Sequence, residues 1–142
     1  MILDGNGWID AELTERVIGV FYSVYNELQP GFVESVYENA LAFALREDGL
    51  HVAQQTPLSV TFRGQIVGEF RADLVVERRL LIELKVVSKL NEAHEAQLLN
   101  YLKTTGLRIG LLLIFGPEAQ VKRRVFNPKN PLLSASIRSD LR

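Results

Sequence analysis

The chain has 142 residues, the commonest size for one domain, and its 47% hydrophobic and 23% charged residues are typical of a globular protein. It contains no cysteine, which excludes disulfides, thiolate metal sites and cysteine nucleophiles, and its net charge of −1 differs from the strongly basic composition of a dedicated DNA binder. No apolar run approaches a membrane span and no secretory signal is visible at the start, so we expect a cytoplasmic protein without a membrane partner.

Two amphipathic helices are predicted first. After a loose lead-in over residues 1–9, Asp10 is placed to cap a helix whose apolar residues recur at intervals of three and four. The Pro30-Gly31 pair ends this helix, and a second helix with the same periodicity follows. Gly49 ends the second helix.

The hydrophobic period then changes to two, which predicts strands. Breaks at Pro57 and around Gly64 separate strands over residues 50–55, 58–63, 66–77 and 80–87. The last of these is almost continuously apolar, which indicates a strand in the middle of a sheet.

A third helix and two further strands complete the predicted order. The helix runs from Asn91 to Thr105, and the strands cover residues 108–115 and 121–126. A surface tail is expected over residues 127–142. The sequence thus predicts one α/β (α+β) domain over residues 10–126, with a mixed sheet and helices packed against it.

The charge is divided unevenly along the chain. Residues 1–60 carry nine acids and two bases, a net charge of −7, whereas residues 61–142 carry eight acids and fourteen bases, a net charge of +6. One interpretation is a polyanion-binding face in the second half. The other is that the two halves pair their charges across the fold.

Two charged residues interrupt the most apolar predicted strand. Glu83 and Lys85 flank Leu84, so both point to the same face of the sheet. If the strand before it forms a hairpin with this one, Asp73 meets Glu83 near one end of the pair. Two converging carboxylates repel each other unless a cation or a proton intervenes, and hard oxygen ligands suit Mg²⁺ or Mn²⁺.

A structural interpretation of these charges stays open beside the metal site. In it Glu83 and Lys85 form a cross-strand ion pair and Asp73 is a turn residue. Glu34 likewise has a structural interpretation, as a carboxylate near the helix N-terminus. The run from Lys122 to Arg124 is most simply a solvated edge of the sheet.

The third predicted helix carries a polar stripe. His94, Gln97 and Tyr101 are spaced i, i+3 and i+7, which stacks them on one side of the helix. Such a stripe can hold phosphates or a base. The alternative is an ordinary half-buried helix edge, with His94 as a structural imidazole.

Several motifs occur in an order that resembles a known family. They are Gly31-x-x-Glu34-x-x-Tyr37, Gly68-x-x-x-Ala72-Asp73-Leu74, Ile82-Glu83-Leu84-Lys85, His94-x-x-Gln97 and Gly110-Leu111-Leu112. Together they resemble the PD-(D/E)XK nuclease superfamily. The Gln97-x-x-x-Tyr101 element is similar to its RecB-like branch, and the whole set more closely resembles the small bacterial GxxExxY proteins.

The resemblance implies a restriction-endonuclease-like core and metal-dependent hydrolysis of phosphodiester bonds. Asp73 and Glu83 would then ligate Mg²⁺ or Mn²⁺, with the carbonyl of Leu84 as a further ligand. Glu34 would complete the acidic cluster, and Lys85 would orient the attacking water and stabilise the developing charge.

The resemblance also implies a substrate and its binding residues. Gln97 and Tyr101, together with His94, would position the substrate, a nucleic acid, with DNA preferred over RNA. Because the sequence has no helix-turn-helix pattern, we expect a homodimer or a larger complex. The alternative functions are a catalytically silent nucleic-acid-binding or assembly module of the same fold, and an unrelated α/β protein with structural ion pairs.

Overall fold

The computed structural model describes residues 10–127. The predicted lead-in over residues 1–9 lies outside the described residues, as does the predicted tail beyond Asn127. No helix in the described part combines the length and the apolarity that crossing a membrane takes.

Two helices, α1 (Ala11–Leu28) and α2 (Glu34–Glu47), lie on the same face of the sheet. Both helices are confirmed, but the predicted cap of the first is wrong. Asp10 adopts a left-handed conformation with φ of 51° and its side chain makes no capping hydrogen bond. Its carboxylate instead lies 3.6 Å from Nε of Arg79. Arg79 belongs to the turn that precedes the strand beginning at Leu80, and the start of α1 lies near this turn.

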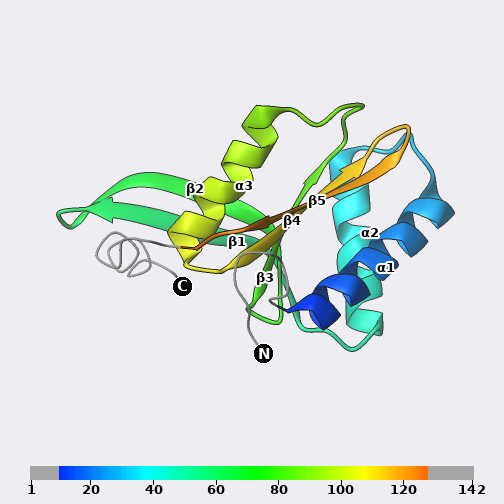
Figure 1. The fold of residues 1–142 in the computed structure, drawn as a ribbon, viewed down its shortest axis with the longest axis horizontal. Helices are drawn as coiled ribbons and strands as arrows, with labels where there is room; N and C mark the ends of the chain where they lie inside the picture. The colour runs from blue at the N-terminus through cyan, green and yellow to red at the C-terminus, as the bar shows by residue number, and fades with distance from the viewer. Residues whose placement is uncertain (1–9, 128–142) are drawn as a thin grey trace.

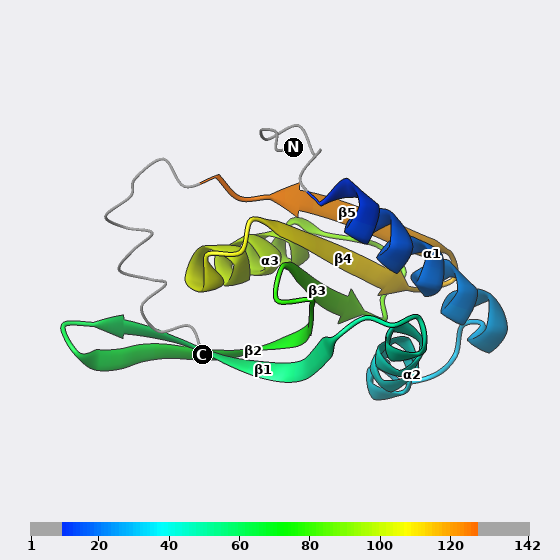
Figure 2. The same cartoon turned by 90° about the horizontal axis from the view of Figure 1, so that it is seen from below.

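Five strands form one mixed sheet in the order β1-β2-β3-β4-β5. Their bounds are β1 Val52–Phe62, β2 Gln65–Val76, β3 Leu80–Lys85, β4 Ile109–Phe115 and β5 Ala119–Val125. β3 and β4 are parallel and the other neighbours are antiparallel. The helix α3 (Glu92–Thr105) connects the parallel pair and covers the face opposite α1 and α2 (Figures 1 and 2). The predicted α+β class is confirmed.

The sheet therefore separates two hydrophobic cores. Alternate residues of the central strands pack against α1 and α2, among them the fully buried Ile82 and Leu84. The residues between them pack against α3, as Leu81 and Leu112 do. This alternation explains why the central strands are apolar at almost every position.

The expected break at Pro57 is wrong. β1 runs without interruption from Val52 to Phe62, and Pro57 lies opposite Arg71 of β2. β1 is an edge strand, where a proline is tolerated because its missing N–H need not remove a hydrogen bond from the sheet. The predicted strands over residues 50–55 and 58–63 are therefore one strand.

The hairpin of β1 and β2 bends where it joins the rest of the sheet. Ala72 lies in the core under α3, whereas Leu74, two residues further on, lies in the core under α1 and α2. A straight strand would place both on the same face. Opposite Asp73, at the middle of this change, Gln55 has a left-handed backbone with φ of 51°. Beyond this bend the hairpin projects from the body of the molecule (Figure 1).

Candidate active site

Two carboxylates meet where β2 and β3 separate. The ladder between these strands ends at Leu74 and Ile82, so Asp73 and Glu83 form the next pair. There the backbone N–H of Asp73 donates to Oε2 of Glu83 at 3.0 Å, and the backbone N–H of Leu84 donates to Oδ2 of Asp73 at 2.8 Å. Each carboxylate thus accepts from the opposite strand, which fixes both side chains at the fork.

Both carboxylates are buried, and their charges are poorly compensated. Glu83 is 3% exposed and Asp73 is 9% exposed. Burial, and next the charge of Asp73, raise the pKa of Glu83 to about 8 despite the backbone donor. Burial also raises the pKa of Asp73, against the opposing effect of the hydrogen bond from Leu84. Such a pair takes up a proton or a cation near neutral pH.

Lys85 is the cation that faces this pair. It follows Glu83 by two residues on β3, and its charge lowers the pKa values of Glu83, Asp73 and Glu34. In the described part of the chain Lys85 makes no ion pair of 4.0 Å or less. Glu83 and Lys85 therefore do not form a direct ion pair. The ammonium group of Lys85 instead stabilises the charged carboxylates from a longer distance.

The turn before α2 brings Glu34 to the fork. Gly31 has φ of 125°, a conformation that suits glycine. The hydroxyl of Tyr37 donates to the carbonyl of Gln29 at 2.6 Å and accepts from the N–H of Phe32 at 3.2 Å, so it ties the turn together. The Tyr37 ring stacks on Phe115 with 4.2 Å between ring centroids, which anchors the turn to β4. The glycine and tyrosine of the motif thus hold the backbone from which Glu34 projects.

Glu34 is half-buried, and the charges of the other acids affect its pKa. Burial and then the charge of Asp73 raise its pKa, while Lys85 lowers it. A carboxylate that only stabilised the helix N-terminus would not need to face Asp73. Glu34, Asp73, Glu83 and Lys85, which come from three different elements, therefore lie within electrostatic reach of one another.

Sequence reasoning missed two residues at this point, Glu38 and Gln55. Glu38 lies one helical turn after Glu34 and is 7% exposed. The amide nitrogen of Gln55 donates to Glu38 at 2.8 Å and to Asp73 at 3.3 Å, and that of Gln54 donates to Glu38 at 3.0 Å. The spacing of Glu34 and Glu38, four residues apart on one helix, could have indicated that the two acids lie on the same side. Gln55 could not have been found this way, because a polar residue in an edge strand is ordinary.

One polar residue on α3, Tyr101, lies near the acids, and a second, Gln97, is hydrogen-bonded to it. Gln97 donates to the hydroxyl of Tyr101 at 3.1 Å. Tyr101 is 5% exposed, and burial followed by the charges of Glu83 and Asp73 raises the pKa of its phenol. The hydroxyl group of Tyr101 therefore lies within electrostatic reach of the fork.

His94 has a structural contact in the same helix. Its Nδ1 accepts from the backbone N–H of Asn91 at 3.4 Å, while the Asn91 side chain accepts from the backbone N–H of His94 at 3.1 Å. This reciprocal pair is a capping box at the start of α3, with histidine in the place of the usual glutamate or glutamine.

One residue of the basic run Lys122–Arg124 on β5 forms an ion pair within the fold. Arg124 pairs with Glu95 of α3, and so ties the edge strand to the helix. β5 is an edge strand of the sheet, as expected, and Lys122, Arg123 and Arg124 on it are each partly exposed. Side chains of this length bury their stems along the sheet while their charged ends reach out.

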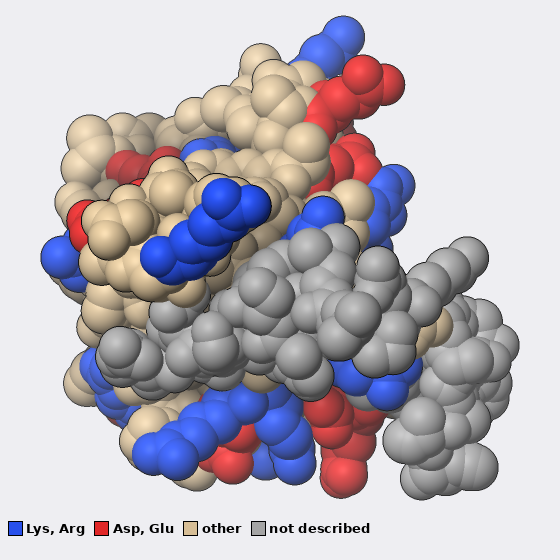
Figure 3. All heavy atoms as spheres, turned by 90° about the vertical axis from the view of Figure 1, so that its left-hand side faces the viewer, with Lys and Arg blue, Asp and Glu red and all other residues tan. Residues whose placement is uncertain are grey.

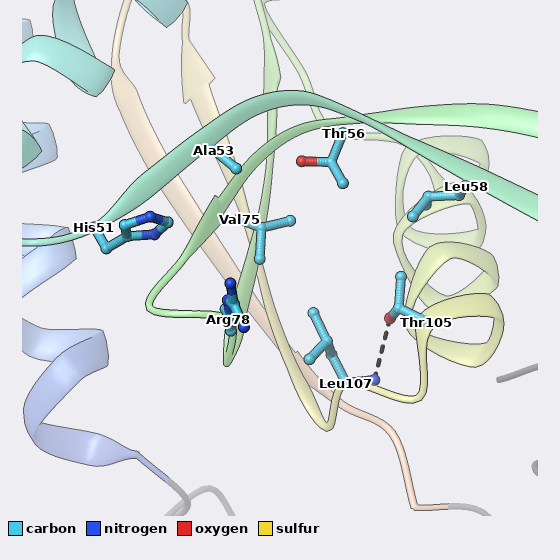
Figure 4. A pocket seen from close by; sticks show the side chains of 8 residues that line it. All are labelled: His51, Ala53, Thr56, Leu58, Val75, Arg78, Thr105 and Leu107. Atoms are coloured by element: carbon cyan, nitrogen blue, oxygen red, sulfur yellow. Dashed lines mark hydrogen bonds between the residues drawn. The ribbon is translucent and has the colours of Figure 1, made fainter. Parts of the chain in front are cut away.

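A cavity of about 470 Å³ lies apart from the acids (Figure 4). It opens between β1, β2 and the end of α3, and its walls include Leu58, Val75 and Leu107. His51 and Arg78 stand at one side of it. Because none of the acids at the fork lines this cavity, it is not the site where they act.

The donor set at the fork suits a hard divalent cation. Among residues 10–127 no three histidine or acidic side chains are arranged to hold a metal by themselves. Magnesium does not require such a cage, because one or two carboxylates, water and a substrate phosphate commonly bind it. Two buried carboxylates with raised pKa values are a fitting pair of ligands for that coordination.

The fold and the fork define the class of protein. A mixed sheet with two helices on one face, a crossover helix on the other, and paired acids followed by a lysine at a strand fork make a restriction-endonuclease-like α+β fold. The chain belongs to the PD-(D/E)XK nuclease superfamily, whose family model matches residues 11–125.

The comparison with solved structures supports the fold alone. A solved structure titled "Crystal structure of SSO0001" is similar over 89% of this chain, with a TM-score of 0.54 and 17% sequence identity. This chain spans 64% of the length of that one. No curated protein matches the sequence significantly.

Proposed function

We propose that this protein is a metal-dependent nuclease that hydrolyses phosphodiester bonds in DNA, and that it stands close to the GxxExxY proteins and the RecB-like branch of its superfamily. The observation that carries the proposal is the pair of buried carboxylates, Asp73 and Glu83, held at the strand fork by reciprocal backbone hydrogen bonds. A purely structural role does not explain two repelling acids at the junction of two cores.

Each residue at the fork has a role in the proposed reaction. Asp73, Glu83 and the carbonyl of Leu84 would hold Mg²⁺ or Mn²⁺, with Glu34 completing the acidic cluster directly or through water. A divalent cation at that place lowers the pKa of water and neutralises phosphate charge. Lys85 would orient the attacking water and stabilise the charge that develops on the phosphoryl oxygens.

The polar residues of α3 would hold the substrate beside the acids. Gln97 and Tyr101 form one hydrogen-bonded unit that reaches the fork, and its donors suit a phosphate oxygen. His94 lies at the start of the same helix, and we propose that its second ring nitrogen contacts the substrate backbone while Nδ1 keeps the cap. A homodimer or a larger complex would extend this small contact surface.

The test combines metal binding with cleavage. We expect Mn²⁺ binding, measured by calorimetry with and without a short DNA duplex, to be lost in Asp73→Ala and Glu83→Ala. Cleavage of plasmid and oligonucleotide DNA should fall by at least about a hundredfold in these variants and in Lys85→Ala, because each removes charge stabilisation at the reacting phosphate. Glu47→Ala, an exposed acid on α2, is the matched control and should behave as the wild type.

Two results would count against the nuclease. Unchanged cleavage in Asp73→Ala or Glu83→Ala would refute the assigned site. Salt-dependent DNA binding without turnover in Mn²⁺ would favour the catalytically silent binding module instead.

A further inference from the structure

The outer part of the β1–β2 hairpin, residues 57–71, projects from the body of the molecule, and we call it the arm. Figures 1 and 2 show two strands that continue beyond α3 with no described helix over their end. The two strands are paired with each other along the arm's length, from Pro57 opposite Arg71 to Phe62 opposite Gln65. Their positions are therefore fixed by backbone hydrogen bonds.

The end of the arm carries a group of exposed apolar side chains. Phe62, Ile66 and Val67 are 58%, 57% and 61% exposed. A bulge produces part of this group, because Val60 pairs with Gly68 and Thr61 with Ile66, which leaves Val67 as the extra residue. Phe62 lies opposite Gln65 and Ile66 opposite Thr61, so these two side chains point to opposite faces of the ribbon. Exposed apolar residues at the end of the arm mark a surface that meets a partner.

Basic residues accompany the apolar group. The guanidinium of Arg63 lies 4.8 Å from the centroid of the Phe62 ring at the tip, and Arg71 is exposed at the base. Glu69 is the acid of the arm, so the arm has a net charge of +1. Figure 3 looks onto the end of the arm and shows Lys and Arg side chains on that face, with Asp and Glu side chains also on it.

The arm is also joined directly to one acid of the pair, since β2 forms one side of the arm and carries Asp73. Asp73 lies nine positions after Gly64, the residue at the tip. At about 3.3 Å per residue the tip lies at most about 30 Å from the fork. That length corresponds to about nine base pairs at 3.4 Å each, so a longer duplex whose axis runs along the arm, with one phosphate at the fork, extends past its tip.

We propose that the arm lies in the major groove of a DNA duplex that is bound at the acid pair, an inference that rests on the proposed nuclease function. A two-stranded ribbon fits the major groove of B-DNA, where apolar side chains contact thymine methyl groups. The major groove of A-form RNA is too deep and narrow for side chains to read, and uracil has no such methyl group. The arm therefore selects duplex DNA as the substrate.

A second copy of this chain is the rival occupant, because exposed strand edges also pair with each other. Pro57 argues against it, since a proline on the outer strand cannot donate to an added strand. The arginines at the two ends of the arm favour a polyanion instead.

The test measures binding by the full-length protein to a 24-base-pair DNA duplex, with Ca²⁺ in place of Mg²⁺. The arm variant combines Phe62→Ser, Ile66→Ser and Val67→Ser. Phe43→Ser is the matched control, because Phe43 is 63% exposed on α2, away from the arm. We expect the arm variant to bind at least about tenfold more weakly, the control to bind as the wild type, and both to keep the wild-type circular dichroism spectrum.

A duplex with deoxyuridine in place of thymidine isolates the groove contact. It should weaken binding by the wild type but not by the arm variant, since only the wild type touches the methyl groups. Equal affinity of the wild type and the arm variant for the thymidine duplex would overturn the proposal. So would a wild-type dimer that the arm substitutions convert to a monomer in sedimentation, which assigns the arm to a second copy.

The two proposals fail in different ways. If the arm variant loses affinity but the wild type cleaves nothing in Mg²⁺ or Mn²⁺, the nuclease assignment falls while the arm's role in binding stands. If the wild type cleaves DNA and the arm variant binds and cleaves equally well, the arm proposal falls alone.

Discussion

Gln55 links the two acids that approach the fork from different elements. Its amide donates to Glu38 on α2 and to Asp73 on β2. Its backbone lies in the left-handed region at φ of 51°, where a residue with a Cβ is disfavoured by about 1–2 kcal/mol. Strain of this kind is kept where the surrounding contacts require it. We infer that Gln55 holds Asp73 in place for metal binding.

We expect Gln55→Ala to reduce the affinity for Mn²⁺ and the rate of DNA cleavage by about tenfold, because the Asp73 carboxylate loses a donor that stabilises its charged form. Titration calorimetry and cleavage assays measure the two effects. Gln54→Ala is the control, since Gln54 contacts Glu38 but not Asp73. Gln55→Gly should be more stable than Gln55→Ala by about 1 kcal/mol yet equally impaired, because glycine accepts the backbone conformation. Equal function in all four proteins would refute the role of Gln55.

At the scale of whole elements, the position of α3 depends on how closely it approaches β4. A Cβ atom on Gly110 of β4 would lie 2.8 Å from Cδ1 of Leu98 and 3.3 Å from Cδ2 of Leu102. The missing side chain therefore lets the helix sit against the strand. Tyr101 lies between these two leucines in sequence, so the same contact sets its distance from Glu83.

We predict that Gly110→Ala destabilises the protein by about 1–3 kcal/mol, because the added methyl group overpacks this contact. It should also lower the cleavage rate, since α3 carries Gln97 and Tyr101. Denaturation in urea measures the first effect. Gly19→Ala provides the comparison: nothing lies within 4 Å of a Cβ there, and alanine in the interior of α1 should stabilise the protein by about 0.5–1 kcal/mol.

For the molecule as a whole, the fork is the place where the two cores and the arm meet. Ile82 and Leu84 bury one face of β3 under α1 and α2, while Glu83 between them points to the face of α3. Of three ion pairs among residues 10–127, one joins the acidic first part of the sequence to the basic second part. Asp10–Arg79 links the two halves, but Arg16–Asp48 and Glu95–Arg124 each lie within one.

The acids at the fork make the stability of the metal-free protein depend on pH. The pKa of Glu83 is about 8 in the folded state and close to its ordinary value of 4.5 in the unfolded state, so the folded protein binds more protons between these values. The free energy of unfolding therefore falls as pH rises from about 5 to about 8, by at most about 1.4 kcal/mol per pH unit for one proton. Denaturation in EDTA across this range measures it.

Glu83→Gln should reduce this slope and stabilise the metal-free protein at pH 9, because glutamine keeps an acceptor for the N–H of Asp73 without the charge. A residual slope of the same sign should persist, since the pKa values of Asp73 and Glu34 are also raised. A variant with the wild-type slope would show that Glu83 is not the group that titrates.

Much of the fold was predictable because local periodicity reports burial. The three helices and the central strands follow from apolar spacing, and Asn91 marks the start of α3 correctly. Pro57 was misleading, because the cost of a proline depends on whether its strand lies at an edge, which is a property of the sheet. The predicted cap at Asp10 failed for a similar reason, since Arg79, which is distant in sequence, lies near its carboxylate.

The sequence by itself determined that Asp73, Glu83 and Lys85 carry charge into apolar strands, and the resemblance to the PD-(D/E)XK nucleases added Glu34 to them. Only the tertiary structure decided how their carboxylates are held, that Glu38 and Gln55 join them, and that His94 also caps a helix. The physical reason is range. Periodicity records what each residue packs against, whereas hydrogen bonds and charge coupling depend on distances between elements that the chain brings together only when it folds.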